Sequence, residues 1–135
     1  MSVPDGLTTG ARATLRITVT DADTALAAGS GDVPVLATPR LLALAEAACC
    51  AAIAPRMTPD RTSVGTVVRL EHRQASPVGA ELDIEAELTE ISGSRLVFMF
   101  IARPADDSDR VVGAGTVERV VVDRERFLAR SDSGG

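Results

Sequence analysis

The residue whose type and position could do chemistry is Glu46, the one carboxylate in the apolar stretch LLALAEAACCAAIA from Leu41 to Ala54. A run that is apolar on all sides predicts a helix buried in a core rather than one lying on a surface. Burying a carboxylate costs on the order of several kcal/mol unless it is paired or neutralised. Glu46 is therefore either a paired structural residue or the working group of a site.

The only histidine of the chain, His72, is the natural partner for this acid. It lies in a segment of alternating polarity, on the same predicted strand face as Val68 and Leu70, which should point into the core. We expect Glu46 and His72 to reach one enclosed cavity, where they would form a base or nucleophile pair. The alternative is that each is a hydrogen-bonded core residue.

A third polar group opens the predicted helix. Thr38 precedes Pro39, and Thr is a favoured N-cap while Pro suits the first helical position. The free N–H groups at a helix N-terminus would stabilise a developing oxyanion beside Thr38. Capping alone would also explain a threonine here.

The spacing of the cysteines and of the strand glycines does not favour a metal site or a phosphate-binding loop. Cys49 and Cys50 are adjacent, so they point about 100° apart and should not bridge each other. We expect both to be small buried hydrophobes in a reducing compartment, and we expect no metal site, because the usual ligand spacing is missing. The strand glycines Gly113 and Gly115 lack a following helix, so they indicate close packing or a bend rather than a phosphate loop.

Composition narrows the class of protein. The 135 residues fit one domain over 1–135, with 1–5 and 130–135 expected to fray, and 45% are hydrophobic. A net charge of −5, only 2% aromatic residues and no basic stripe argue against nucleic-acid binding. No signal peptide is visible and the fourteen-residue apolar run is short for a membrane span, so we expect a cytoplasmic protein without a membrane partner.

Periodicity predicts the order of the elements. Alternation indicates strands at 13–20, 63–75, 80–91, 95–103 and 111–122, and helical patterns lie at 21–28, 38–55 and 124–129. The phase of the third strand slips near Thr89, which predicts a bulge. The segment LVFMFIA is apolar on both faces and predicts a central strand.

One helix that is apolar all round needs a strongly curved sheet to bury it. A curved antiparallel sheet wrapped around one long central helix is the hot-dog fold, of the α+β class. The helix still shows one flank, and a second copy would close it. We therefore expect a homodimer, with a tetramer as a further option.

The chain resembles a known family over most of its length. The segments VPVLATPRLLALAEAAC, TSVGTVVRLEHRQASPVGA, LTEISGSRLVF and GAGTVERVVVDRERFLA are similar to those of the fluoroacetyl-CoA thioesterases, a family of hot-dog enzymes. The resemblance implies hydrolysis of a thioester. It needs no cofactor, and coenzyme A enters as part of the acyl-CoA substrate.

The resemblance also implies site residues. Catalytic roles fall on Thr38, Glu46 and His72, and substrate contacts on Gly65, Arg119 and Leu36. His72 would activate water or stabilise charge, Glu46 would be nucleophile or general base, and Thr38 would position the acyl carbonyl.

Two departures from the family bear on the acyl group. The fluoroacetate-specific enzyme carries phenylalanines just before the threonine that act as a lid, whereas residues 27–37 contain no aromatic residue. Val117 also stands where that enzyme has histidine. We expect a small acyl-CoA in general, or a related thioester, as substrate.

Other functions stay open at this point. A non-catalytic acyl-CoA or fatty-acid binding protein on the same fold is the main alternative, and the missing aromatic lid favours it. A hot-dog hydratase is less consistent, because the helix carries no histidine. The arginines considered for the phosphates of coenzyme A are Arg40, Arg56, Arg61, Arg95 and Arg103.

Overall fold

The computed structural model describes residues 3–106 and 108–132. The elements are, in chain order, β1 (Arg12–Thr18), η1 (Asp21–Asp23), α1 (Ala25–Ala28), α2 (Thr38–Ile53), η2 (Ala54–Arg56), β2 (Arg61–His72), β3 (Glu81–Ser92), β4 (Arg95–Pro104), β5 (Gly113–Asp123) and α3 (Arg124–Asp132). The expected strands and the long helix are present within a few residues of their predicted bounds. Residues 130–132, expected to fray, continue α3, whereas 1–2 and 133–135 lie outside the described residues.

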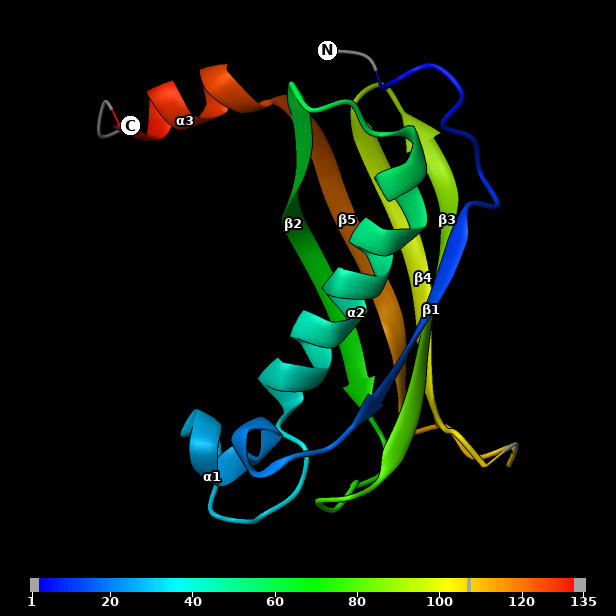
Figure 1. The fold of residues 1–135 in the computed structure, drawn as a ribbon, viewed down its shortest axis with the longest axis vertical. Coiled ribbons are helices and arrows are strands. Elements are labelled where there is room, and N and C mark those ends of the chain that lie inside the picture. Colours follow the sequence, from blue (N-terminus) through cyan, green and yellow to red (C-terminus); the bar gives the residue numbers. More distant parts are fainter. Residues whose placement is uncertain (1–2, 107, 133–135) are drawn as a thin grey trace.

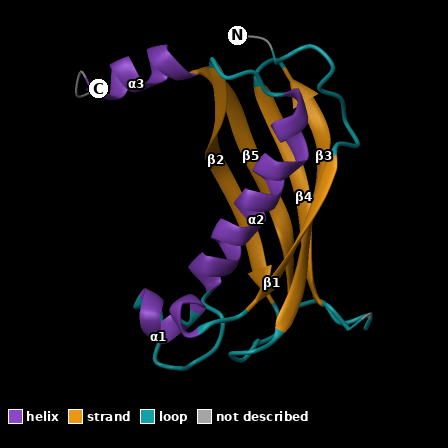
Figure 2. Cartoon of the chain, viewed as in Figure 1, coloured by secondary structure: helices purple, strands orange, loops and turns teal. Residues whose placement is uncertain are grey.

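The strands form one antiparallel sheet in the spatial order β1-β3-β4-β5-β2. The sheet curves, and α2 runs along its concave face (Figures 1 and 2). This is the hot-dog fold that the sequence predicts. Strand β4 is central, as its apolar character on both faces indicates, and β1 and β2 are the edges.

The core lies between α2 and the inner face of the sheet. The buried residues of α2 are Leu41, Leu44, Ala45, Ala48, Cys49, Ala52 and Ile53. Strand β3 alternates as predicted, with Leu82, Ile84, Ala86 and Leu88 buried. The register of β3 against β4 shifts between Leu88 and Glu90, which confirms the bulge predicted at Thr89.

The strand glycines allow the close packing that the sequence suggested. A Cβ added to Gly113 would lie 2.8 Å from Cδ2 of Leu41, so the missing side chain lets β5 approach the first turns of α2. A Cβ on Gly115 would lie 1.9 Å from the backbone oxygen of Arg69 on β2. Neither position would accept a side chain without moving the backbone or the helix beside it.

One side of α2 stays uncovered, together with the neighbouring inner face of β2, and we call this surface the open flank. Its exposed apolar residues are Ala43, Ala47, Cys50 and Val68. Two expectations are corrected here: Cys50 is exposed although Cys49 is buried, and Val68 is 43% exposed although its strand face was expected to be core. The reason is that α2 packs mainly over β1 and β3, at the other side of the sheet.

By length and composition the segment Thr38–Arg56, 19 residues, is long and apolar enough to cross a membrane. Here it packs against the sheet, and its Leu41, Ala45 and Ala48 are fully buried in the protein core. The core position accounts for its apolar character.

Candidate active site

The first turn of α2 places the Thr38 hydroxyl against His72. The amide of Leu41 donates to the carbonyl of Ala37, so Ala37 is the N-cap and Thr38 is already inside the helix. The prediction that Thr38 caps the helix is therefore wrong by one position. Its side chain is consequently free of capping and lies 2.8 Å from Nδ1 of His72, through Oγ1.

His72 is the last residue of β2, and its ring is half-buried. Burial lowers its pKa below the ordinary value of 6.5, and a backbone hydrogen bond at Gln74 offsets part of that effect. The ring is therefore neutral near pH 7, with one nitrogen a donor and the other an acceptor. Nδ1 is engaged by Thr38, while Nε2 is buried and has no protein partner among the described residues. Nε2 is thus a buried polar atom whose hydrogen-bonding capacity the described residues leave unused.

Glu46 lies two helical turns further along α2 and is held by Arg119 of β5. Nη1 of Arg119 donates to Oε2 of Glu46 at 2.7 Å. The same guanidinium donates from Nε to Oγ of Ser63 and from Nη2 to the carbonyl of Ser63, both at 2.8 Å. The Arg119 side chain is only 9% exposed, whereas that of Glu46 is 32% exposed. Glu46 is therefore a fixed carboxylate at the edge of the open flank, not a carboxylate in a dry core.

The predicted pairing of Glu46 with His72 inside one chain is not what the structure contains. No hydrogen bond joins the two side chains within residues 3–106 and 108–132. His72 bonds to Thr38 instead, and Glu46 bonds to Arg119. Gly65 of β2 touches the Glu46 carboxylate, and His72 lies seven residues further along the same strand. At about 3.3 Å per residue, Gly65 and His72 lie roughly 23 Å apart along the strand. The eight residues from Thr38 to Glu46 rise about 12 Å along α2. One chain thus carries two separate polar pairs rather than one triad.

Gly65 provides the space for the Glu46 carboxylate. A Cβ at this position would lie 2.4 Å from Oε2 of Glu46 and 3.4 Å from Nη1 of Arg119. Any side chain here would push the carboxylate away from the guanidinium. The resemblance assigns both Gly65 and Arg119 to substrate contacts, but here both lie against Glu46. The hydrogen bonds of Arg119 go to Glu46 and Ser63 of the protein itself.

A cavity of about 340 Å³ adjoins the Thr38–His72 pair. Leu36 and Ala37 line it at the start of α2, Val33 and Asp32 line it from the preceding loop, and no aromatic residue is among its lining residues. Leu36 is itself only 1% exposed, so it forms the apolar base of this cavity rather than a projecting contact.

Sequence reasoning did not find Ser63, which holds Arg119 through two hydrogen bonds. It also missed Asp23, which accepts a 2.8 Å hydrogen bond from Nε of Arg40, and whose carbonyl accepts from the amide of Ala37. Asp23 thereby fixes the entry into α2. A local signal existed only for Asp23, since Thr20 and Asp23 have the spacing of a capping box.

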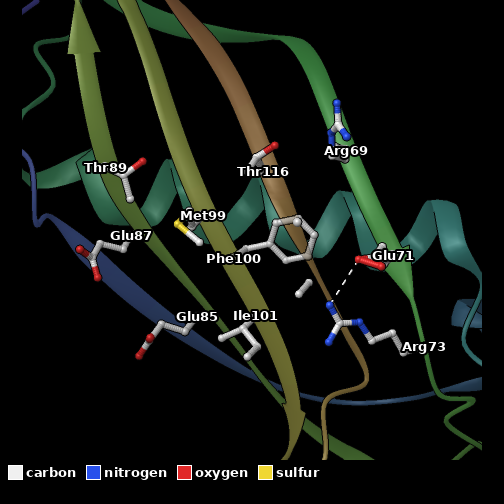
Figure 3. A pocket seen from close by; sticks show the side chains of 12 residues that line it. Arg69, Glu71, Arg73, Glu85, Glu87, Thr89, Met99, Phe100, Ile101 and Thr116 are labelled. Atoms are coloured by element: carbon white, nitrogen blue, oxygen red, sulfur yellow. Dashed lines mark hydrogen bonds and ion pairs between the residues drawn. The ribbon is translucent and has the colours of Figure 1, made fainter.

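Within the described residues, neither a metal site nor a reactive thiol accompanies the Thr38–His72 and Glu46–Arg119 pairs. Among the residues that the structure describes, no group of three His, Cys, Asp or Glu side chains could hold a metal ion. Burial raises the pKa of the Cys49 thiol to about 12, which leaves it unreactive although it lies close to Arg119 and Glu46. A larger cavity, of about 730 Å³, lies on the opposite face of the sheet (Figure 3), and Arg73 lines both this cavity and the one beside Thr38 and His72.

Comparison with known proteins identifies relatives of this arrangement. Residues 19–125 match the family described as fluoroacetyl-CoA-specific thioesterase, FlK. The fluoroacetyl-CoA thioesterase of Streptantibioticus cattleyicolor is 36% identical over 96 residues, which are 71% of this chain and 67% of that protein.

Solved structures agree with this match. The structure of the fluoroacetyl-CoA thioesterase FlK superimposes with a TM-score of 0.87 at 31% identity, over 97% of this chain and 99% of that one. A mutant of FlK in complex with acetyl-CoA gives a TM-score of 0.86 at 29% identity, over 95% and 98% of the two chains. A Thermus thermophilus protein described as a thioesterase superfamily member is 20% identical with a TM-score of 0.84, over 96% and 93%, and supports the fold alone.

Proposed function

This chain belongs to the family of fluoroacetyl-CoA-specific thioesterases, and on that premise we propose that it hydrolyses a small acyl-CoA to the free acid and coenzyme A. The observation that carries the proposal is the Thr38–His72 contact of 2.8 Å at the start of α2, with Nε2 of His72 left without a partner among the residues that the structure describes. A hydroxyl, a neutral imidazole and a helix N-terminus together suit a carbonyl that becomes an oxyanion.

The missing aromatic lid supports a range of small acyl groups rather than fluoroacetyl alone. The loop before Thr38 offers Val33 and Asp32 to the cavity, and no ring from residues 27–37 closes it. Discrimination between similar small groups is worth only about 1–3 kcal/mol even in a well-shaped apolar pocket. An open cavity of mixed polarity should therefore discriminate weakly between acetyl, fluoroacetyl and propionyl thioesters.

The residue roles follow from where each group is held. Thr38 and the first amides of α2 polarise the thioester carbonyl, and His72 carries or stabilises the transferred proton. Glu46 is the nucleophile, or the general base that activates water; its Oε1 accepts no hydrogen bond within the described part of the chain. The carbonyl carbon gains an oxygen from water, the carbon–sulfur bond breaks, and the thiolate of coenzyme A takes up a proton.

A homodimer reconciles these roles with the separation of the two pairs. Glu46 and Thr38–His72 both border the open flank but lie too far apart to act on one carbonyl within a chain. A second copy would cover the exposed Ala43, Ala47 and Val68 and the unpaired edge of β2. In that assembly the Glu46 of one copy would act with Thr38 and His72 of the other.

A turnover screen tests the proposal. Acetyl-, fluoroacetyl-, propionyl-, isobutyryl- and benzoyl-CoA are each incubated with the protein, and the release of free thiol is followed. Hydrolysis of several short acyl-CoAs, lost in Glu46→Gln and in His72→Gln, is the expected result. Thermal stabilisation by acyl-CoA without release of thiol would instead favour the non-catalytic binding protein.

A further inference from the structure

The cavity at the start of α2 is bordered by a loop, residues 30–35, that follows α1 (Figure 1). Both ends of this loop are tied to the same residue. The amide of Ser30 donates to the carbonyl of Ala25 at 3.0 Å, and the amide of Ala25 donates to the carbonyl of Val35 at 2.9 Å. Pro34 restricts the backbone between these anchors further. The loop is therefore a fixed wall of the cavity rather than a mobile lid.

Asp32 lies between the two anchors of this loop and lines the cavity together with Thr38 and His72. Its side chain is exposed, and it has no ion pair or hydrogen bond to any residue that the structure describes. An ionised carboxylate accepts several hydrogen bonds and donates none. The wall of the cavity thus offers a negative charge whose hydrogen-bonding capacity the chain itself leaves unused.

Arg73 is the other charged residue that lines this cavity, and it is engaged elsewhere. Its Nη2 donates to Oε2 of Glu71 at 3.3 Å. Figure 3 shows the guanidinium beside Glu71, in the larger cavity on the opposite face of the sheet. His72 adds no positive charge near pH 7, because burial lowers its pKa below 6.5. The charge of Asp32 is therefore unopposed in the cavity beside Thr38.

The size of the cavity brings Asp32 within reach of an acyl group whose carbonyl lies at Thr38. A volume of about 340 Å³ has a mean width of about 7 Å, its cube root. An acyl chain of four heavy atoms spans about 4 Å from the carbonyl carbon to its last atom, and a hydrogen bond adds about 3 Å. Such a chain can therefore extend from Thr38 to a hydrogen bond with the Asp32 carboxylate.

We infer that Asp32 determines the substrate class of this site, which is a short acyl-CoA whose acyl chain ends in a hydroxyl or an ammonium group. This inference rests on the proposed hydrolysis of a small acyl-CoA and specifies the acyl group. A terminal donor makes a charge-assisted hydrogen bond to the carboxylate. A terminal methyl group makes none, and a terminal carboxylate is repelled. Asp32 acts on the far end of the acyl chain and takes no part in breaking the thioester bond.

Thioesters of equal chain length separate this effect from size. Butyryl-, 3-hydroxypropionyl- and β-alanyl-CoA end in a methyl, a hydroxyl and an ammonium group at the same position, and malonyl-CoA ends in a carboxylate. In the wild type, kcat/KM for β-alanyl-CoA should exceed that for butyryl-CoA by about five- to tenfold, the effect of a charge-assisted contact at an exposed carboxylate. The value for 3-hydroxypropionyl-CoA should lie between them, and malonyl-CoA should be the poorest substrate. Spontaneous hydrolysis of each thioester is subtracted.

The ratios of kcat/KM, rather than their absolute values, are compared between variants, because coenzyme A is common to all four substrates. Asp32→Asn keeps the shape of the side chain and removes its charge, so the ratio of β-alanyl- to butyryl-CoA should fall towards one. Asp32→Arg should reverse the order and favour malonyl-CoA. The matched control is Asp5→Asn, because Asp5 is exposed and its neighbour Gly6 lies beside Arg56, at the opposite end of α2. The control should keep every wild-type ratio.

Dissociation constants of the same thioesters give a second readout that needs no turnover. They are measured by calorimetry in the Glu46→Gln protein, with and without Asp32→Asn. A wild-type preference for butyryl-CoA, or a ratio that Asp32→Asn leaves unchanged, overturns the inference. A wild type that releases no thiol from any thioester overturns the proposed hydrolysis instead. The dissociation constants then decide whether Asp32 selects the acyl group, so the two proposals fail separately.

Discussion

Arg119 holds Glu46 with a 2.7 Å hydrogen bond and is itself held by two hydrogen bonds to Ser63. The carboxylate is therefore fixed in place by a cation that has little freedom of its own. A mutation can therefore remove the charge of Glu46 while Arg119 keeps its two hydrogen bonds to Ser63.

Glu46→Gln should lower kcat by roughly 10²–10⁴-fold, since the amide is neither a nucleophile nor a base. Its oxygen still accepts from Arg119, so the free energy of unfolding should change by less than about 1 kcal/mol. Arg119→Met should instead lower stability by about 1–3 kcal/mol, because it leaves Ser63 and Glu46 without their partner. Thiol release and urea denaturation measure the two effects. Equal stability losses in both variants would contradict the arrangement.

Gly65→Ala should keep the fold but misplace the carboxylate. The added Cβ meets the end of the flexible Glu46 side chain at 2.4 Å, which can move away at little cost to packing. We expect about 10²-fold lower kcat, the effect of a displacement of about 1 Å at a reacting group. Melting temperature and thiol release are the measurements, and Val67→Ala, at an exposed position of the same strand, is the control. A Gly65→Ala variant of undiminished activity would show that the position of Glu46 does not matter.

Thr38→Ala should lower kcat by roughly 10²-fold or more, because it removes the hydroxyl beside His72. Thr38→Ser keeps the hydroxyl and should retain most of the activity. Both variants should unfold at nearly the wild-type denaturant concentration, since Thr38 caps no amide and is exposed. If Thr38→Ser is as impaired as Thr38→Ala, the methyl group rather than the hydroxyl is what the site requires.

The pH dependence should follow the neutral form of His72. Burial lowers its pKa below 6.5, so the active neutral ring persists at pH 6.5 and is lost only at lower pH. The acid limb of kcat/KM should therefore have its midpoint below 6.5. The stability that His72 contributes is likewise present above 6.5 and falls as the pH drops from 6.5 towards the folded-state pKa, because the unfolded chain binds the proton first.

Measurement of kcat/KM and of urea denaturation between pH 5 and 8 checks both signs. His72→Gln should remove the dependence of stability on pH over the interval below 6.5. A midpoint above 6.5 would mean that the histidine is stabilised as a cation, contrary to its burial.

Mixing two inactive variants should restore activity if the site is shared between copies. The Glu46→Gln and His72→Gln proteins are unfolded together and refolded at equal concentration. Half of the dimers then contain one variant chain of each kind, and each of these has one complete site. About one quarter of wild-type activity is expected. Refolding each variant alone is the control, and a mixture no more active than its components would place the complete site within a single chain.

Much of this protein was predictable from its sequence because local patterns determine local structure. Period-two alternation gave the strands, the apolar run gave α2, and the phase slip at Thr89 gave the bulge. The types of Thr38, Glu46 and His72, and the resemblance of the segments around them, indicated a thioesterase. These properties depend on neighbours within a few residues along the chain.

Only the tertiary structure decided which side chains meet. Glu46 pairs with Arg119, and Thr38 with His72, across separations of 73 and 34 residues. Those contacts are set by the register of β2 on β5 and by the line along which α2 crosses the sheet. A shift of one residue in either would turn Ser63 or His72 to the other face, and a local pattern does not encode that choice. The sequence predicted that α2 would leave one flank uncovered, but only the packing of α2 over β1 and β3 decided that Cys50 and Val68 lie on it.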